Sequence, residues 1–399
     1  MTIKSSRMVT LGFASVAHTF SHMFVLFFAT IVLVLEAEWG LSYAELMTLS
    51  IPGAVLFGAC ALPAGWLGDK WSGSGMLAVF FVGTGVASVL TGLADTPIGL
   101  AIGLALIGSF AAIYHPVGIP WLIKHTTNHG RALGINGVFG SIGTAIAAVL
   151  AGFLAELFGW RAAFIVPGGI SILIGLLFII GIKQGWIVER EGEAAPSAEQ
   201  SVGDIRRVFV ILALTVLCAG LIYQALSYAL PKVFEERLTL DAGHSVLGIG
   251  GLVSLCYAIS AFGQLIGGEL ADRYSKKWVY AIGIAFQVPV AIAAYFLTGP
   301  ALVAMAALFV SFNFVGQPAE NALLARFTPL SLRGRIYGVK FVLTLGVSAI
   351  GVGMIPIIHA LLGNLDALFI LLALVALIAF VAAIFIPRGR DVDAMAGGD

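Results

Sequence analysis

The chain has 399 residues, of which 60% are hydrophobic and 11% are charged, and its formal net charge is zero. A soluble protein of this length needs far more charge to cover its surface, so the composition excludes a soluble protein and indicates one that lies in a lipid bilayer. The balanced charge, without a clustered basic face, gives no support for a nucleic-acid partner.

Apolar segments long enough to cross a membrane as helices, which takes about 20 residues each, recur along the whole chain. In chain order, the twelve predicted spans centre on residues 10–35, 43–67, 76–94, 98–122, 132–155, 162–182, 208–230, 246–270, 278–297, 300–325, 336–360 and 365–386. The first span lacks a small-residue cleavage site, so we expect a retained helix rather than a signal peptide. The predicted fold class is an all-α membrane protein.

One long polar segment divides the chain. It runs from about Gln184 to Asp204 and is rich in Glu, Ser and Gln, which cannot bury a core. We therefore predict three parts: an N-terminal six-helix bundle (1–183), a flexible cytoplasmic linker (184–206) and a C-terminal six-helix bundle (207–399).

Basic residues predict the topology. The chain has 21 Lys and Arg residues. All but Arg161, Lys232, Arg237 and Lys340 lie in loops, termini or span ends on the same side of the predicted membrane. The positive-inside rule places that side, with both termini, in the cytoplasm of a multi-pass inner-membrane protein. Arg161, Lys232 and Arg237 fall on the other side, which leaves Lys340 as the one basic residue expected inside a span.

The two halves resemble each other, with an offset of about 203 residues. The matching segments are Gly65–Lys70 with Gly268–Arg273, His115–Pro116 with Gln317–Pro318, and Gly130–Gly134 with Gly334–Gly338. Two pseudo-symmetric bundles are what a secondary transporter needs, because they can rock about one central site.

The segment Gly65–Lys70 resembles the loop signature that follows the second helix in the major facilitator superfamily, and Gly268–Arg273 is a fuller copy. This resemblance covers the whole chain and implies the major facilitator fold. A narrower resemblance, to the fosmidomycin-resistance branch of small-molecule exporters, is carried by the residues His18, Met23, Tyr114–Pro116 and Gly130–Arg131. The chain departs from that branch at His22, where the branch has an acid, and it lacks the Gly-Pro pair of the antiporter signature in the fifth helix.

The resemblance implies a conformational latch at the cytoplasmic ends of the helices. Asp69 is expected to face the start of the eleventh helix, and Asp272 the start of the fifth, where a carboxylate accepts from Arg or from free N–H groups. An ordinary solvated loop charge is the alternative. The residues assigned to the latch are Gly65, Asp69, Lys70, Arg131, Gly268, Asp272, Arg273 and Arg335.

Three histidines form the leading candidate for a central site, because ionisable groups inside a span are costly and usually functional. His18 and His22 are four residues apart and share a helix face. Counted at about 1.5 Å per residue from the charged flanks, His18 and His115 both lie roughly 13–16 Å deep, near the membrane midplane. The cluster would carry a proton or bind an organic anion. Three separate histidines bonded to backbone carbonyls, or a transition-metal site, are the alternatives.

Glu320 and Lys340 form a second candidate. Both are expected roughly 8–9 Å inside the cytoplasmic boundary on neighbouring helices, which permits an ion pair. Alternatively, Lys340 reaches to the interface and Glu320 is solvated. Asn136 is the first-half counterpart of Lys340.

Polar and aromatic side chains within the spans complete the predicted substrate- or proton-binding set and suit a small polar solute. Besides the residues above, they are Tyr114, Tyr223, Gln224, Tyr228, Asn313, Gln317 and Asn321. Some are expected only to join helices.

These observations predict a secondary active transporter of a small organic solute that works by alternating access. It would be a monomeric proton-coupled symporter or antiporter, driven by the proton gradient without a cofactor, and export is one direction left open. The alternatives are a transition-metal transporter using His18, His22 and His115, and a non-transporting assembly factor on the same fold, which would have little reason to keep interior charges. An enzyme is not expected, because no nucleophile–base constellation or phosphate loop is present.

Overall fold

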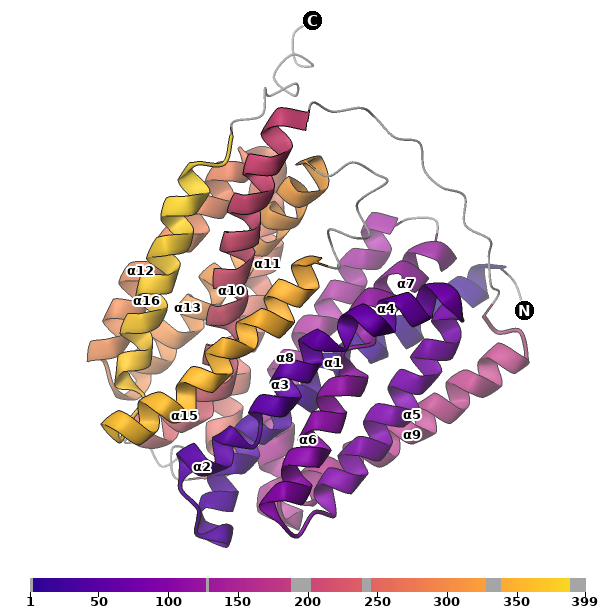
Figure 1. Ribbon diagram of the computed structural model, residues 1–399, viewed down its shortest axis with the longest axis horizontal. Coiled ribbons are helices and arrows are strands. Elements are labelled where there is room, and N and C mark those ends of the chain that lie inside the picture. The colour runs from indigo at the N-terminus through magenta and orange to yellow at the C-terminus, as the bar shows by residue number, and fades with distance from the viewer. Residues whose placement is uncertain (1–2, 127–128, 188–201, 239–244, 328–338, 388–399) are drawn as a thin grey trace, which may run out of the picture.

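The computed structural model describes residues 3–126, 129–187, 202–238, 245–327 and 339–387. Within these ranges, twelve helical segments are long and apolar enough to cross a membrane, as the sequence predicted. Figure 1 shows them as two bundles, one built from the first part of the chain and one from the second. We call these bundles the N half and the C half.

In the N half, several spans are interrupted helices. The elements are α1 (Ile3–Trp39), α2 (Tyr43–Thr48), α3 (Ile51–Ala59), α4 (Ala61–Lys70), α5 (Gly73–Gly92), α6 (Pro97–Ala111), the π-helix η1 (Tyr114–Gly118), α7 (Ile119–His125), α8 (His129–Phe158) and α9 (Ala162–Lys183). The second span thus consists of α2, α3 and α4, and the fourth of α6, η1 and α7. Gly40, at a φ of 64°, turns the chain between α1 and α2, because only glycine adopts this backbone conformation without strain.

The described residues of the C half also form six spans, but here the eleventh span is the interrupted one. The elements of the C half are α10 (Val202–Arg237), α11 (Val246–Arg273), α12 (Lys276–Phe296), α13 (Gly299–Phe327), the π-helix η4 (Val342–Gly346), the 3₁₀ helix η5 (Val347–Ala349), α15 (Ile350–Leu362) and α16 (Asp366–Ile384). The linker predicted at 184–206 lies largely outside the described residues.

The two halves meet along specific helices. α8 packs against α11, α3 against η4, and α1 against α10, while α2 lies beside α15 near the bottom of Figure 1. Glycines permit the closest contacts: a Cβ atom at Gly58 of α3 would lie 1.8 Å from the Gly346 Cα, and one at Gly250 of α11 would lie 2.3 Å from the Ala148 oxygen. Small residues at helix interfaces let backbones approach in this way.

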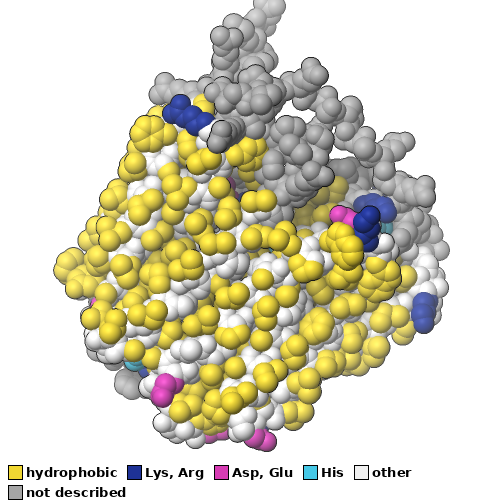
Figure 2. All heavy atoms as spheres, in the orientation of Figure 1, with side chains coloured by type: hydrophobic (Ala, Val, Ile, Leu, Met, Phe, Trp, Pro, Cys, Tyr) yellow, Lys and Arg dark blue, Asp and Glu magenta, His cyan; other side chains and the backbone are white. Residues whose placement is uncertain are grey.

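The outer surface is apolar. Figure 2 shows hydrophobic side chains over most of the visible face, with a few charged side chains near its upper, lower and right-hand margins. Buried polar residues line the interior instead, among them His115, Asn136 and Glu320. This distribution is typical of a protein whose surroundings are lipid and whose interior carries the polar groups.

One prediction about the charges was wrong. Lys232 was expected beyond the end of the seventh span, but α10 continues through Pro231 to Arg237, so Lys232 lies within the helix with 8% of its surface exposed. Lys340 is therefore not the one basic residue inside a span. Lys232 tolerates burial because two carboxylates hold its ammonium, each at 2.7 Å. Below, the end of the bundle that carries Asp69 is called the Asp69 end, and the opposite end is called the Lys232 end.

Candidate functional site

The three histidines lie together between the halves. His18 and His22 come from α1 and His115 from η1, and the centroids of their rings are 5.1, 5.2 and 5.3 Å apart. One ring nitrogen from each lies within 4.8 Å of the others. His115 is 5% exposed and the other two are half-buried. The cluster is compact enough for its members to share one proton, water molecule or ligand.

A local change of helix type positions His115. η1 has π-helical geometry over Tyr114–Gly118, with Pro116 inside it. Proline has no N–H to donate, and a π turn accommodates an extra residue, which redirects the neighbouring side chains; π turns are frequent at functional sites. At Gly65 of α4, an added Cβ would lie 3.2 Å from the Pro116 Cβ, so this glycine of the repeated loop signature allows α4 to pack against η1.

His18 is held in one orientation by α8. Its Nδ1 lies 2.8 Å from the backbone oxygen of Asn136, so Nδ1 donates to this carbonyl. Tyr114 stacks on the same imidazole, at 4.8 Å between centroids, and donates from its hydroxyl to the Asn136 Oδ1 at 2.8 Å. A Cβ at Gly140 would lie 2.5 Å from the His18 ring, so α8 needs glycine there to make room for the ring.

His115 has the least satisfied polar group in the cluster. Both of its ring nitrogens are buried and have no hydrogen-bond partner among the described residues. A buried polar atom without a partner costs about 1–3 kcal/mol, so such a group usually has a water, a proton or a ligand nearby. The alternative, in which each histidine is bonded separately to a backbone carbonyl, therefore holds only for His18. The Nδ1 of His22 instead lies 3.5 Å from the hydroxyl of Tyr223.

The C half reaches the cluster through two aromatic residues. Tyr223 of α10 contacts His22 and shares a 3.0 Å hydrogen bond with Thr144 of α8. Phe341, just before η4, stacks on His115 with centroids 4.9 Å apart and planes inclined by 25°. Both halves therefore touch the histidines, as a central transport site requires.

Other predicted site residues on α10 join helices. Tyr228 donates to the backbone oxygen of Val25 at 2.7 Å, and Gln224 donates to that of Leu345 at 3.4 Å. These hydrogen bonds link α10 to α1 and to η4. The hydroxyl of Tyr228 and the amide nitrogen of Gln224 thus donate to backbone oxygens and not to the histidines.

Glu320 and Lys340 lie in contact, with their charged atoms 2.7 Å apart. Their side chains are only 5% and 12% exposed, so Lys340 does not reach to the interface. Tyr280 of α12 donates to the second carboxylate oxygen of Glu320 at 2.9 Å, and Lys340 also donates to Asn321. Sequence reasoning missed Tyr280, although it is the fifth residue of the ninth span and so lies near the depth of Glu320.

The amides on α13 have separate partners. Gln317 accepts from Gln264 of α11 at 3.0 Å, whereas Asn313 donates to the Ala219 backbone oxygen of α10 at 3.4 Å. Asn321 contacts Lys340, so the predicted polar face of the tenth span does not converge on the histidines.

The predicted latch residues lie at the Asp69 end. Asp69, Lys70, Arg131 and Asp272 are exposed, and within the described part of the chain no ion pair involves Asp69 or Asp272. Arg273 pairs with Glu269 of its own helix. A Cβ at Gly268 would meet nothing within 4 Å, and Arg335 lies outside the described residues.

Comparison with known proteins agrees with this architecture. The family model described as Major Facilitator Superfamily matches residues 11–343 and 238–395. A bacterial homologue of the human lysosomal transporter Spinster, solved in an inward-facing and unoccupied conformation, has a TM-score of 0.71, with 18% identity over 96% of this chain and 95% of that one.

Three curated relatives match between 64% and 96% of the chain at low identity. The fosmidomycin resistance protein of Escherichia coli is 22% identical over 96% of this chain and 94% of its own length. A probable sulfoacetate transporter of Cupriavidus necator is 26% identical over 76% and 75%, and a D-galactonate transporter of Escherichia coli is 24% identical over 64% of each chain. The described residues form twelve apolar spans in two similar halves with a polar site between them, and the chain belongs to the major facilitator superfamily, whose members are membrane transporters and not enzymes.

Proposed function

We propose that this protein is a proton-coupled secondary transporter of a small organic anion, which binds at the cluster of His18, His22 and His115. The observation that carries the proposal is a group of three imidazoles between the two halves, in which both nitrogens of His115 have no partner among the described residues. Imidazole changes charge near neutral pH, so the cluster is an anion site when protonated and releases the anion when neutral.

The composition of the site favours an anion. Glu320, the buried acidic residue of the predicted binding set, is paired with Lys340 and therefore does not present a free carboxylate. Two relatives are described as transporters of D-galactonate and of sulfoacetate, both of which are anionic at neutral pH. Their names and the histidine chemistry point to the same class of solute.

The contacts of the cluster suggest how binding couples to movement. His22 contacts Tyr223 and His115 contacts Phe341, both from the C half, whereas the histidines themselves belong to the N half. A proton or solute that alters these contacts changes how the halves fit together, which is the differential interaction that any population shift requires. The Asp69 end would face the cytoplasm and the protein would act as a monomer in the inner membrane.

Thermal unfolding of the purified protein tests the proposal. Galactonate and sulfoacetate should raise the melting temperature, and more so at lower pH, whereas neutral galactose should have no effect. His115→Gln should abolish the response, and His125→Gln, which alters a histidine bonded to Trp121 of its own helix, should preserve it. Equal stabilisation by galactose, or an unchanged response in His115→Gln, would contradict the anion site.

A transition metal is the second candidate, because ring nitrogens within 4.8 Å of one another can converge on one ion. The cluster supplies imidazole ligands alone, without the thiolate or carboxylate that such sites often add. Calorimetry with zinc at neutral pH decides: binding that is lost in His115→Gln and left intact by excess galactonate would favour the metal.

A further inference from the structure

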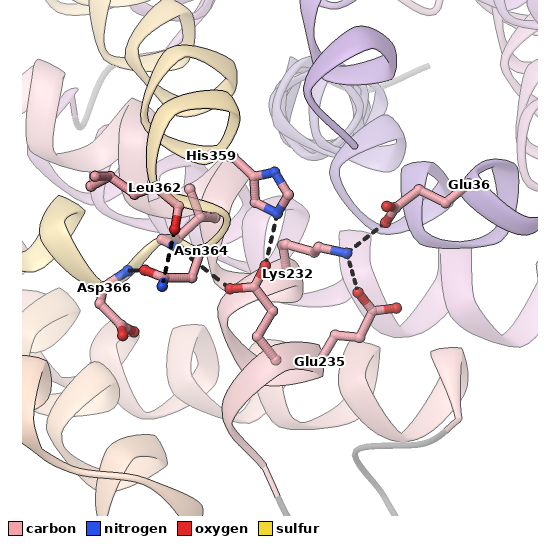
Figure 3. A network of polar contacts seen from close by, with 9 residues as sticks. Glu36, Lys232, Glu235, His359, Leu362, Asn364 and Asp366 are labelled. Atoms are coloured by element: carbon pink, nitrogen blue, oxygen red, sulfur yellow. Dashed lines mark hydrogen bonds and ion pairs between the residues drawn. The ribbon is translucent and has the colours of Figure 1, made fainter. Parts of the chain in front are cut away.

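A second polar cluster lies at the Lys232 end, away from the histidines. Figure 3 shows the ammonium of Lys232 between two carboxylates, those of Glu36 from α1 and Glu235 from its own helix, at 2.7 Å each. Next to it, Glu236 accepts from His359 of α15 at 3.0 Å. We call this group of five residues the outer cluster.

The outer cluster joins the two halves through Lys232. Glu36 belongs to the N half and Glu235 to the C half, so the ammonium bridges them. Tyr43 of α2, fully buried, adds a second contact from the N half: its ring lies 5.1 Å from the ammonium and 4.9 Å from the imidazole of His359.

The other two basic residues of this end stay within one half. Arg161 pairs with Asp95 at 2.6 Å, and both belong to the N half. Arg237 pairs with Asp366 at 3.3 Å and donates to the backbone oxygen of Tyr295 at 2.9 Å, all in the C half. Lys232 is thus the basic residue of this end that connects the halves.

The two partners of Lys232 differ in what happens when the halves separate. Glu36 would move away with the N half, whereas Glu235 is three residues along the same helix and would stay. A buried ammonium that loses every partner costs several kcal/mol, but one that keeps a carboxylate loses much less. Pro231 precedes Lys232, and a proline within a helix provides a place where α10 can bend.

We infer that the outer cluster is the outer gate of the transporter and that Lys232 releases one of its two carboxylate partners when the gate opens. In the closed state Glu36 and Glu235 share the ammonium; in the outward-open state Glu235 alone holds it. The inference rests on the proposed function, because it requires alternating access. The two carboxylates therefore have opposite effects: Glu36 stabilises the closed state, and Glu235 lowers the cost of opening.

Spin-label distances measured on the full-length purified protein test this inference without any substrate. Labels at Ile98 on α6 and Leu361 on α15, which are 74% and 77% exposed, report the separation of the halves at this end once the three native cysteines are replaced. Glu36→Gln should raise the ratio of the long to the short distance about fivefold, as expected for a partly buried ion pair. Tyr43→Leu should raise it too.

The decisive variant is Glu235→Gln in the Tyr43→Leu background, where the open state is populated. It should lower the ratio, because the ammonium of the open state then has no partner. Glu38→Gln is the matched control: Glu38 is two residues from Glu36 but contacts Trp160 and Arg161 of its own half, so the ratio should not change. If Glu36→Gln fails to fold, Glu36→Asp, with its shorter side chain, should shift the ratio in the same direction.

Two results would overturn the inference: an unchanged ratio in the Glu36 and Tyr43 variants, or a Glu235→Gln variant that opens this end as Glu36→Gln does. Failure of the proposed function is a separate result. If the distances shift as expected while neither galactonate nor sulfoacetate stabilises the protein, the gate stands and the anion proposal falls.

Discussion

Phe341 of the C half lies face to face with His115 of the N half, with ring centroids 4.9 Å apart. The phenyl ring covers one side of an imidazole whose two nitrogens have no hydrogen-bond partner among the described residues. Because Lys340 precedes Phe341 in the chain, the buried ion pair with Glu320 and the covering of His115 belong to one segment. Movement of this segment would uncover the histidine.

We expect Phe341→Ala to expose His115. The rate at which diethylpyrocarbonate modifies this histidine, followed by mass spectrometry, should rise several-fold, because the reagent needs access to a ring nitrogen. Phe341→Tyr keeps an aromatic ring and should leave the rate close to that of the unmodified protein. A rate in Phe341→Ala that equals the original one would show that the phenyl ring does not shield the site.

The ion pair between Glu320 and Lys340 should show strong coupling in a double-mutant cycle. Lys340→Ala leaves a buried carboxylate and Glu320→Ala a buried ammonium, and each single change should cost about 3–5 kcal/mol of unfolding free energy. The double variant should cost less than the sum of the two. The measurement is equilibrium unfolding in detergent, and additive losses would mean that the charges do not stabilise each other.

Gly140→Ala should disturb the histidine cluster, since the added Cβ would lie 2.5 Å from the His18 ring. Displacing the ring should cost about 1–3 kcal/mol of stability and weaken anion binding. The same change at Gly137, one turn earlier on α8, is the control, because nothing lies within 4 Å of a Cβ there. Similar melting temperatures for the two variants would argue against a tight fit at His18.

The latch predicted from the repeated loop signature is tested by Asp69→Ala and Asp272→Ala. Each should slow transport into proteoliposomes while membrane insertion and melting temperature stay unchanged, because the carboxylates are exposed and would act between conformations. Glu269→Ala, which removes an exposed carboxylate paired with Arg273 in its own helix, serves as the control. Normal turnover in both aspartate variants would eliminate the latch.

Regular features of the chain made much of the architecture predictable. Apolar length identifies the spans, and counting residues from a charged flank gives depth, which is why Glu320 and Lys340 were expected at one level. Depth does not give rotation about the helix axis. The amides Asn313 and Gln317 share a face, yet they contact α10 and α11 respectively.

Two contacts were beyond the reach of sequence reasoning for the same physical cause. Tyr280 meets Glu320 across 40 residues of chain, and Lys232 meets Glu36 across 196. Such pairs depend on which helices become neighbours. The predicted seventh span ended at residue 230, whereas α10 continues past Pro231 to Arg237 and includes Lys232.

The contact between Gly58 and Gly346 determines where the two halves can turn. Counted from Lys70, Gly58 lies roughly 18 Å from the Asp69 end, near the middle of the membrane. A Cβ at Gly58 would lie 1.8 Å from the Gly346 Cα, so the backbones of α3 and η4 already touch and cannot approach further. In a transporter that works by alternating access, such a contact at mid-depth would act as a pivot: the distance across it would stay constant, while any widening at the Asp69 end would be matched by narrowing at the Lys232 end.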